Sequence, residues 1–96
     1  MSRFSLTVKS KAWRYLSTAV DPEQQVLVFL RGQRADQTRE DWIVSVTSRK
    51  DLPEEAESHG YVGTLGNYPL LVVQRAHLEK LDGRTLSAKG GRLAVL

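Results

Sequence analysis

Two histidines offer the most recognisable chemistry in this 96-residue chain. His59 and His77 lie 18 residues apart, and the sequence places them in different secondary-structure elements. A shared metal site would need them to converge with carboxylates such as Glu57 or Glu79, because metal sites in proteins usually take three or more ligands. Isolated surface histidines are common, and His77 beside Glu79 is more simply a surface residue of a short helix. We therefore expect no bound metal ion and no other cofactor.

The carboxylates of residues 54–57, which follow Pro53, suggest a second kind of chemistry, that of general acids. Catalytic carboxylates need burial or close pairing to shift their pKa. A polar stretch of this kind is instead typical of a solvated loop, or of the first turn of a short helix. No serine lies in a Gly-x-Ser-x-Gly context, and the absence of cysteine removes thiolate nucleophiles, disulfides and sulfur ligands together. We therefore expect a protein that is not an enzyme.

Three glycines, Gly60, Gly63 and Gly66, have a spacing that superficially matches a phosphate-binding loop. The dinucleotide-binding fingerprint needs a strand before it and a helix after it. Here a charged stretch precedes the glycines and an expected strand follows them, so turns and close backbone packing explain them better.

Four residues around one polar stretch are the best candidates for a partner-binding surface. Arg31, Arg34 and Arg39 flank the expected connection 32–41, and Trp42 follows it directly. Cations near an aromatic ring suit a nucleic-acid backbone with stacked bases, while Arg and Trp are also enriched among the anchors of protein interfaces. The alternative is structural: Trp42 begins a buried strand, and the arginines pair with the acidic residues of the same stretch.

The overall charge points only weakly towards nucleic acid. The formal net charge is +3 and the isoelectric point is about 9.5. Acidic residues lie among the basic ones in 34–41, and 51–57 is an acidic stretch. A mild cationic excess of this kind is more often a solvated surface than a nucleic-acid footprint.

The elements that must position these residues follow from the hydrophobic pattern. Apolar residues at helical spacing predict one amphipathic helix over residues 8–19, with Thr7 as its N-cap and Asp21-Pro22 ending it. Residues 75–81 suit one further helical turn, and 32–41 and 48–60 are expected connections. Alternation and β-branched runs predict strands over 4–8, 25–31, 42–47, 61–65, 68–74, 84–87 and 92–95.

This order of elements predicts a single α+β domain over residues 1–96, mainly β, with one N-terminal amphipathic helix packed on the strands. A doubly wound sheet would need crossover helices between parallel strands. The longest apolar runs are too short to span a bilayer, and the first residues lack the apolar core of a signal peptide. We therefore expect a cytoplasmic protein that has no membrane partner.

The sequence resembles the HesB-like, or A-type iron–sulfur assembly, domains. The resemblance rests on a Leu-Thr step at 6–7 leading into a helix with Ala12 and Leu16, and on a valine-rich stretch at 70–73 followed by Leu78 and by Leu-Asp-Gly-Arg-Thr-Leu at 81–86. It implies a HesB-like β-rich sandwich that covers most of residues 4–95.

The sequence departs from this family at the metal-binding positions. Members that handle clusters carry a cysteine after the early strand and a Cys-Gly-Cys near the C-terminus, where this chain has 32–34 and 90–92 without cysteine. Thiolates hold the iron of such clusters, so the resemblance implies the fold without the cluster. We expect a small non-enzymatic protein-interaction module whose partner is an unidentified protein. A nucleic-acid-binding module that uses the basic loop from Arg31 to Trp42 is the alternative. Homodimer formation through an exposed β edge in 84–96 stays open.

Overall fold

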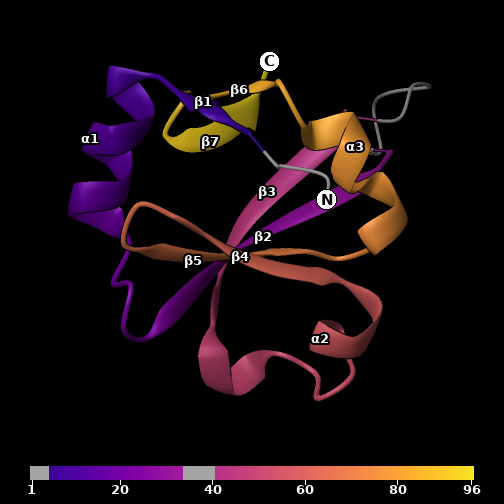
Figure 1. Ribbon diagram of the computed structural model, residues 1–96. Helices are drawn as coiled ribbons and strands as arrows, with labels where there is room; N and C mark the ends of the chain where they lie inside the picture. The colour runs from indigo at the N-terminus through magenta and orange to yellow at the C-terminus, as the bar shows by residue number, and fades with distance from the viewer. Residues whose placement is uncertain (1–4, 34–40) are drawn as a thin grey trace.

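The computed structural model describes residues 5–33 and 41–96, with Glu57 described through its backbone alone. Figure 1 shows two sheets with short helices around them. In chain order the elements are β1 (Thr7–Val8), α1 (Ser10–Ala19), β2 (Gln25–Gly32), β3 (Asp41–Ser48), the 3-10 helix η1 (Arg49–Asp51), α2 (Ala56–His59), β4 (Tyr61–Leu65), β5 (Tyr68–Val72), the 3-10 helix η2 (Arg75–His77), α3 (Leu78–Leu81), β6 (Thr85–Lys89) and β7 (Arg92–Val95).

The larger sheet has the strand order β3-β2-β5-β4. β2 and β3 form a long antiparallel hairpin, β2 runs parallel to β5, and β5 pairs antiparallel with β4. Leu27 of β2 pairs in register with Leu70 of β5, and Phe29 pairs with Val72 two residues further on. Because side chains alternate along a strand, these apolar pairs share one face of the sheet.

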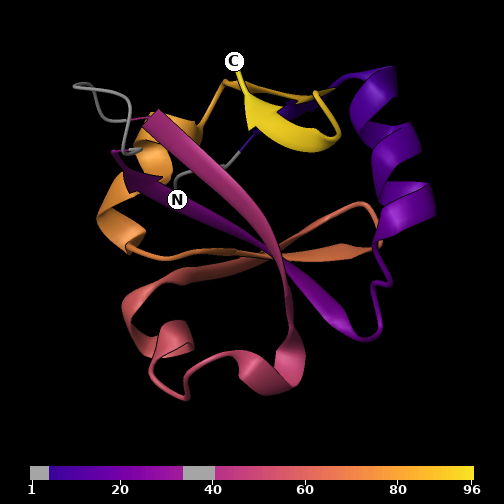
Figure 2. The same cartoon turned by 180° about the vertical axis from the view of Figure 1, so that it is seen from behind.

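The smaller sheet brings the two ends of the sequence together. Its strand order is β1-β6-β7, with β1 parallel to β6 and β6 antiparallel to β7. The Lys9 N–H donates to the Leu86 carbonyl at 2.9 Å, so the residue before α1 is tied to β6. Figure 2 shows α1 beside this sheet from the opposite side.

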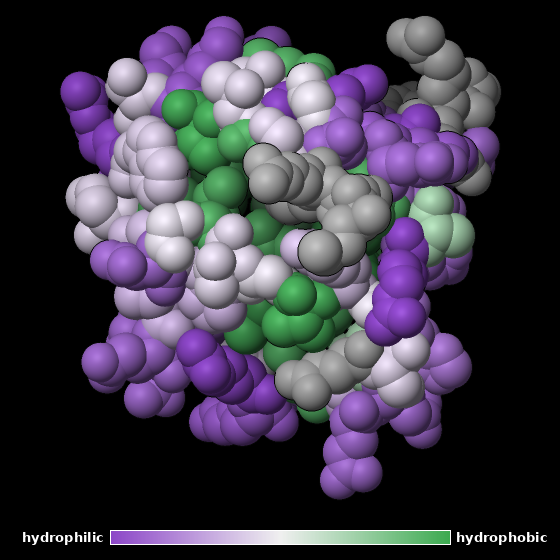
Figure 3. Space-filling view, in the orientation of Figure 1, coloured by the Kyte–Doolittle hydropathy of each residue, from purple (hydrophilic) through white to green (hydrophobic). Residues whose placement is uncertain are grey.

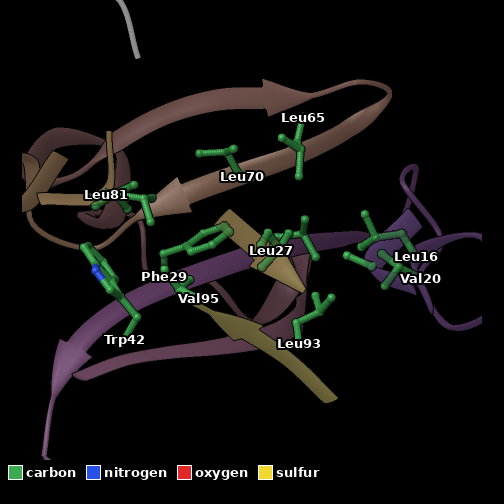
Figure 4. Close-up of a cluster of buried hydrophobic side chains, with 13 residues drawn as sticks. Leu16, Val20, Leu27, Phe29, Trp42, Leu65, Leu70, Leu81, Leu93 and Val95 are labelled. Atoms are coloured by element: carbon green, nitrogen blue, oxygen red, sulfur yellow. The ribbon is translucent and has the colours of Figure 1, made fainter. Parts of the chain in front are cut away.

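One hydrophobic core fills the space between the two sheets and α1. It joins Ala12 and Leu16 of α1 with inward-facing side chains of β2, β5, β6 and β7, and with Trp42 and Leu81. Figure 4 shows these side chains along β2, with Trp42 at one end and Leu16 at the other. Helix α1 forms because its apolar residues recur at helical spacing and bury one stripe against this core.

The helix begins later than the pattern predicts. The N-cap is Lys9, without a side-chain capping bond, so the prediction that Thr7 caps the helix is wrong. Thr7 and Val8 instead pair with Thr85 and Leu86 as a short parallel strand. The predicted C-terminal end is confirmed, since α1 stops at Ala19 before the Asp21-Pro22 step.

Most of the remaining elements agree with the pattern, although the strand predicted over 68–74 ends at Val72 and the strand predicted over 84–87 runs from Thr85 to Lys89. The strands predicted over 25–31, 42–47, 61–65 and 92–95 are confirmed within one residue at each end. The predicted connection 48–60 contains η1 and α2, and the helical turn predicted over 75–81 is formed by η2 and α3. Residues 34–40 of the predicted connection 32–41 lie outside the described residues. The predicted α+β class with mainly β content is confirmed. Nowhere in the described part of the chain is a helix both long and apolar enough to cross a membrane.

Candidate functional site

The structure brings together two of the four residues predicted to bind a partner. Arg31 near the end of β2 and Trp42 near the start of β3 form a register pair across the hairpin. The guanidinium of Arg31 lies over the indole ring, 5.6 Å from its centroid. This is a cation–π geometry, because the ring face carries negative partial charge. Arg34 and Arg39 lie outside the described residues.

Trp42 is core rather than surface. Its side chain is 2% exposed and belongs to the hydrophobic core, which is the structural alternative that the sequence left open. Arg31 Nε and Trp42 Nε1 are both buried, and neither has a hydrogen-bond partner among the described residues. Buried donors of this kind cost free energy when unpaired. Because Trp42 is buried, a partner that binds here would contact Arg31. The prediction that these two residues bind a partner stays a prediction.

A second candidate is an apolar groove on the outer face of the larger sheet. The side chains of β2 and β5 that point away from the core include the apolar residues Val26, Val28 and Leu71, with Val73 directly after β5. Segment 49–59 crosses this face, where Val26 and Leu71 are only 7% and 3% exposed, whereas Val62 of β4 is 50% exposed. Two adjoining hollows remain, of about 470 and 280 Å³. Both are lined by Leu52, Pro53, Ala56 and Leu71.

The rim of this groove is acidic. Glu54 lines the larger hollow and Glu55 the smaller one, and both side chains are exposed. Arg49 also lines the larger hollow, where its Nη2 donates to the Pro22 carbonyl at 2.9 Å. Arg49 keeps its positive charge, so the rim carries two carboxylates and one guanidinium. Figure 3 shows an apolar area in the lower middle of the view, beside the place where α2 lies in Figure 1. The groove therefore combines an apolar floor with negatively charged edges.

The groove residues were missed at the sequence level, although the sequence contains a signal for them. Residues 26–30 and 70–73 are apolar at consecutive positions, so both faces of these strands need cover. The only apolar residues that segment 49–59 offers as cover are Leu52, Pro53 and Ala56. The apolar outer face of these strands is larger than three apolar residues can cover, so part of the sheet face is expected to stay open.

The two histidines lie in different elements, and the side chain of Glu57, one of the carboxylates considered as a ligand, lies outside the described part of the structure. His59 ends α2 and lines the smaller hollow, whereas His77 belongs to η2. The two elements are linked by Arg75, whose Nε and Nη2 donate to the Gly60 carbonyl at 3.3 and 3.2 Å. Across the described residues, no group of three or more His, Cys, Asp or Glu side chains could hold a metal ion.

Two of the three spaced glycines, Gly60 and Gly66, have structural roles, as the sequence favours. At Gly60 a Cβ would collide with the Val72 carbonyl and lie 2.9 Å from the Ala56 carbonyl, so the backbone between α2 and β4 passes close to β5. Gly66 has a φ of 61° in the turn between β4 and β5.

Comparisons of this chain with family models, with curated proteins and with solved structures give no match.

Proposed function

We propose that this protein is a non-enzymatic interaction module that binds a segment of a partner protein. The observation that supports this proposal is the apolar groove with an acidic rim on the outer face of the larger sheet. Val62 in the lining of this groove is 50% exposed, and an exposed apolar side chain with polar residues around it offers a contact point for a protein partner.

The chemistry of the groove suggests the kind of segment that it binds. Its floor of aliphatic side chains favours apolar anchors, which lose water on docking. The carboxylates of Glu54 and Glu55 at the rim favour Lys or Arg beside those anchors, because complementary charge speeds encounter and rejects wrong partners. We therefore propose a partner segment in which aliphatic and basic residues occur together.

Selection from a random peptide library displayed on phage tests this proposal. We expect enriched peptides to combine aliphatic residues with Lys or Arg. The variant Glu54→Lys/Glu55→Lys reverses the charge of the rim without touching the floor, and it should select peptides with Asp or Glu in place of the basic residues.

The variant Glu23→Lys/Glu79→Lys is a matched control. It makes the same change in net charge at two exposed positions outside the groove lining. It should select the same peptides as the unchanged protein. Failure to enrich any peptide, or a preference that both variants shift equally, would contradict the proposal.

The relationship to HesB-like domains is also a proposal. It is supported by the residues that carry the resemblance, which occur in the order of a strand, a short turn and a Leu-x-Gly-containing segment. An experimental structure superposed on members of that family would test it, and a different strand connectivity would refute it. A cytoplasmic location stays a prediction, which fractionation of the source cells would check.

A further inference from the structure

The basic and acidic side chains of this chain are segregated along the sequence. None of the 11 acidic residues lies in 1–20 or 84–96, whereas these two segments carry seven of the 14 basic residues. Their formal side-chain charge is +7, and the charge of residues 21–83 is −4. The small net charge of +3 therefore conceals two strongly different regions.

The fold turns this segregation in sequence into two ends of the molecule. Pairing of β1 with β6 places the N-terminal and C-terminal segments in one sheet, and α1 packs beside β6. We call α1 with this sheet the basic end, although the carboxylate of Asp82 also lies beside its first strand, where Oδ1 accepts from the Ser5 N–H at 2.7 Å. Its described cations are Lys9, Lys11, Arg14, Arg84, Lys89 and Arg92.

The opposite end is acidic. The turn 21–24 and segment 49–59 are held together by the Arg49 N–H, which donates to the Gln24 carbonyl at 2.9 Å. These two stretches contain six acidic and two basic residues. Figure 1 shows them at the bottom of the molecule, with β1, β6 and β7 at the top.

The basic end contains a hollow of about 310 Å³ between α1 and the turn that joins β6 to β7. Lys11, Arg14 and Lys89 line it, and all three side chains are exposed. The complete lining consists of Lys11, Arg14, Tyr15, Thr18, Ala88, Lys89, Gly90 and Gly91, without a carboxylate. Three cations around one hollow with no internal counter-charge favour an anionic ligand.

The neutral residues of the hollow narrow the range of possible ligands further. The turn consists of Gly90 and Gly91, with φ values of 61° and 77°, and a Cβ at either position would meet nothing within 4 Å. The turn therefore presents backbone without side chains in front of the hollow. Tyr15 is half-buried against the core and lines the hollow, where a planar base can stack on its ring.

We propose that this hollow binds the sugar–phosphate backbone of a single-stranded nucleic acid, with a base stacked on Tyr15. Lys11, Arg14 and Lys89 neutralise the phosphates. This site is distinct from the acid-rimmed groove, and the proposal does not depend on the proposed function.

Salt dependence provides the first test. The probe is a fluorescein-labelled oligothymidine of about 12 nucleotides, and the readout is fluorescence anisotropy with the full chain. Three phosphate contacts should give a slope of log K against log salt near −2, so affinity should fall by about 20-fold between 50 and 200 mM salt. A slope near zero, or no binding in low salt, would overturn the proposal.

A charge-matched pair of variants provides the second test. Arg14→Ala/Lys89→Ala removes two proposed phosphate contacts and should weaken binding by about 25-fold at 0.1 M salt. Lys50→Ala/Lys80→Ala changes the net charge equally at exposed positions away from the hollow, and it should change the affinity by less than about twofold. Equal losses from both pairs would show that overall charge binds the strand, and would overturn the site.

Three further readouts separate the proposed ligand from other anions. Tyr15→Leu should lower the affinity for the strand by about fivefold, because it removes one stacked base. Duplex DNA of the same length should bind more weakly than the single strand. Phosphatidylserine vesicles should not retain the protein. Tighter binding of the duplex, or vesicle binding that Arg14→Ala/Lys89→Ala abolishes, would overturn the assignment to a single strand.

Discussion

The guanidinium of Arg31 lies 5.6 Å from the centroid of the Trp42 ring, across the β2–β3 hairpin. Trp42 is 2% exposed, so this cation covers one of the largest side chains of the core. Arg34 and Arg39, which were predicted to contribute to the same binding surface, lie outside the described residues.

Replacement of each member of this pair should have very different effects on stability. Trp42→Ala should lower the free energy of unfolding by about 3–5 kcal/mol, because it leaves a large cavity. Arg31→Met should change it by less than about 1 kcal/mol, since the lost cation–π attraction is offset by removal of an unpaired buried donor. Urea denaturation followed by circular dichroism would check both values, and a large loss for Arg31→Met would contradict this explanation.

The predicted loop surface has its own test. Arg34→Glu/Arg39→Glu should weaken capture of a protein partner if that surface is used, with no change in the urea midpoint. The measurement is a tagged pull-down from source-cell lysate, with and without nuclease, read by mass spectrometry. A partner captured equally by this variant would remove the loop from consideration, and partners lost on nuclease treatment would favour nucleic acid.

Close packing at Gly60 should make this position intolerant of any side chain. Gly60→Ala should cost about 1–3 kcal/mol, because the added Cβ collides with the Val72 carbonyl of β5. Gly32→Ala is the matched control, since its Cβ would meet only Ile43 Cδ1 at 3.7 Å. Its effect should stay within about 0.5 kcal/mol in the same urea measurement. Equal tolerance at both positions would show that Gly60 does not lie as close to the Val72 carbonyl of β5 as described.

The carboxylate of Asp82 should stabilise the start of the described chain. The Ser5 N–H donates to Asp82 Oδ1 at 2.7 Å, and the Gly83 N–H donates to the Ser5 carbonyl at 2.7 Å. Asp82→Ala should therefore lower the free energy of unfolding by about 1 kcal/mol. Glu79→Ala, at an exposed position in α3, should stay within about 0.5 kcal/mol. Amide hydrogen exchange at Ser5 offers a local readout, and unchanged protection in Asp82→Ala would contradict the prediction.

The two tryptophans report on the segregated charge. Trp13 of α1 is 41% exposed at the basic end, whereas Trp42 is buried. In Trp42→Phe the remaining fluorescence should be quenched at least about twofold more by iodide than by caesium, because the local potential attracts anions. In Trp13→Phe both ions should quench weakly, and neutral acrylamide serves as the reference. Equal quenching of Trp13 by the two ions would argue against a basic end.

Local patterns of sequence predicted most elements of the fold, for reasons visible at particular residues. The run 25–31 is long, apolar and β-branched, and β2 forms there. Asp21-Pro22 cannot continue a helix, and α1 ends before it. Thr7 does not cap the helix as predicted, because it pairs in a parallel sheet with Thr85, nearly 80 residues further along the chain.

The candidate sites depend on the same long-range relationships. The basic hollow needs Lys11 of α1 beside Lys89 of β6, and the pairing of β1 with β6 that brings them together has no local signature. The absence of acidic residues from both terminal segments can be read from the sequence. It creates one basic surface only because the fold brings the two segments together in one sheet. The open groove depends in the same way on where segment 49–59 crosses the sheet.

The two ends make this small protein an electric dipole, and ionic strength sets the distance over which the field of each end acts. The molecule measures 34 × 30 × 30 Å. At 0.1 M salt the Debye length of about 10 Å is well below this size, so each end acts on its surroundings alone. At 0.01 M salt, where the Debye length is about 30 Å, the fields of both ends overlap and the net charge dominates. At 0.1 M salt the same protein should therefore interact with a cation exchanger through its α1 end and with an anion exchanger through the opposite end, whereas at 0.01 M salt the cation exchanger alone should retain it.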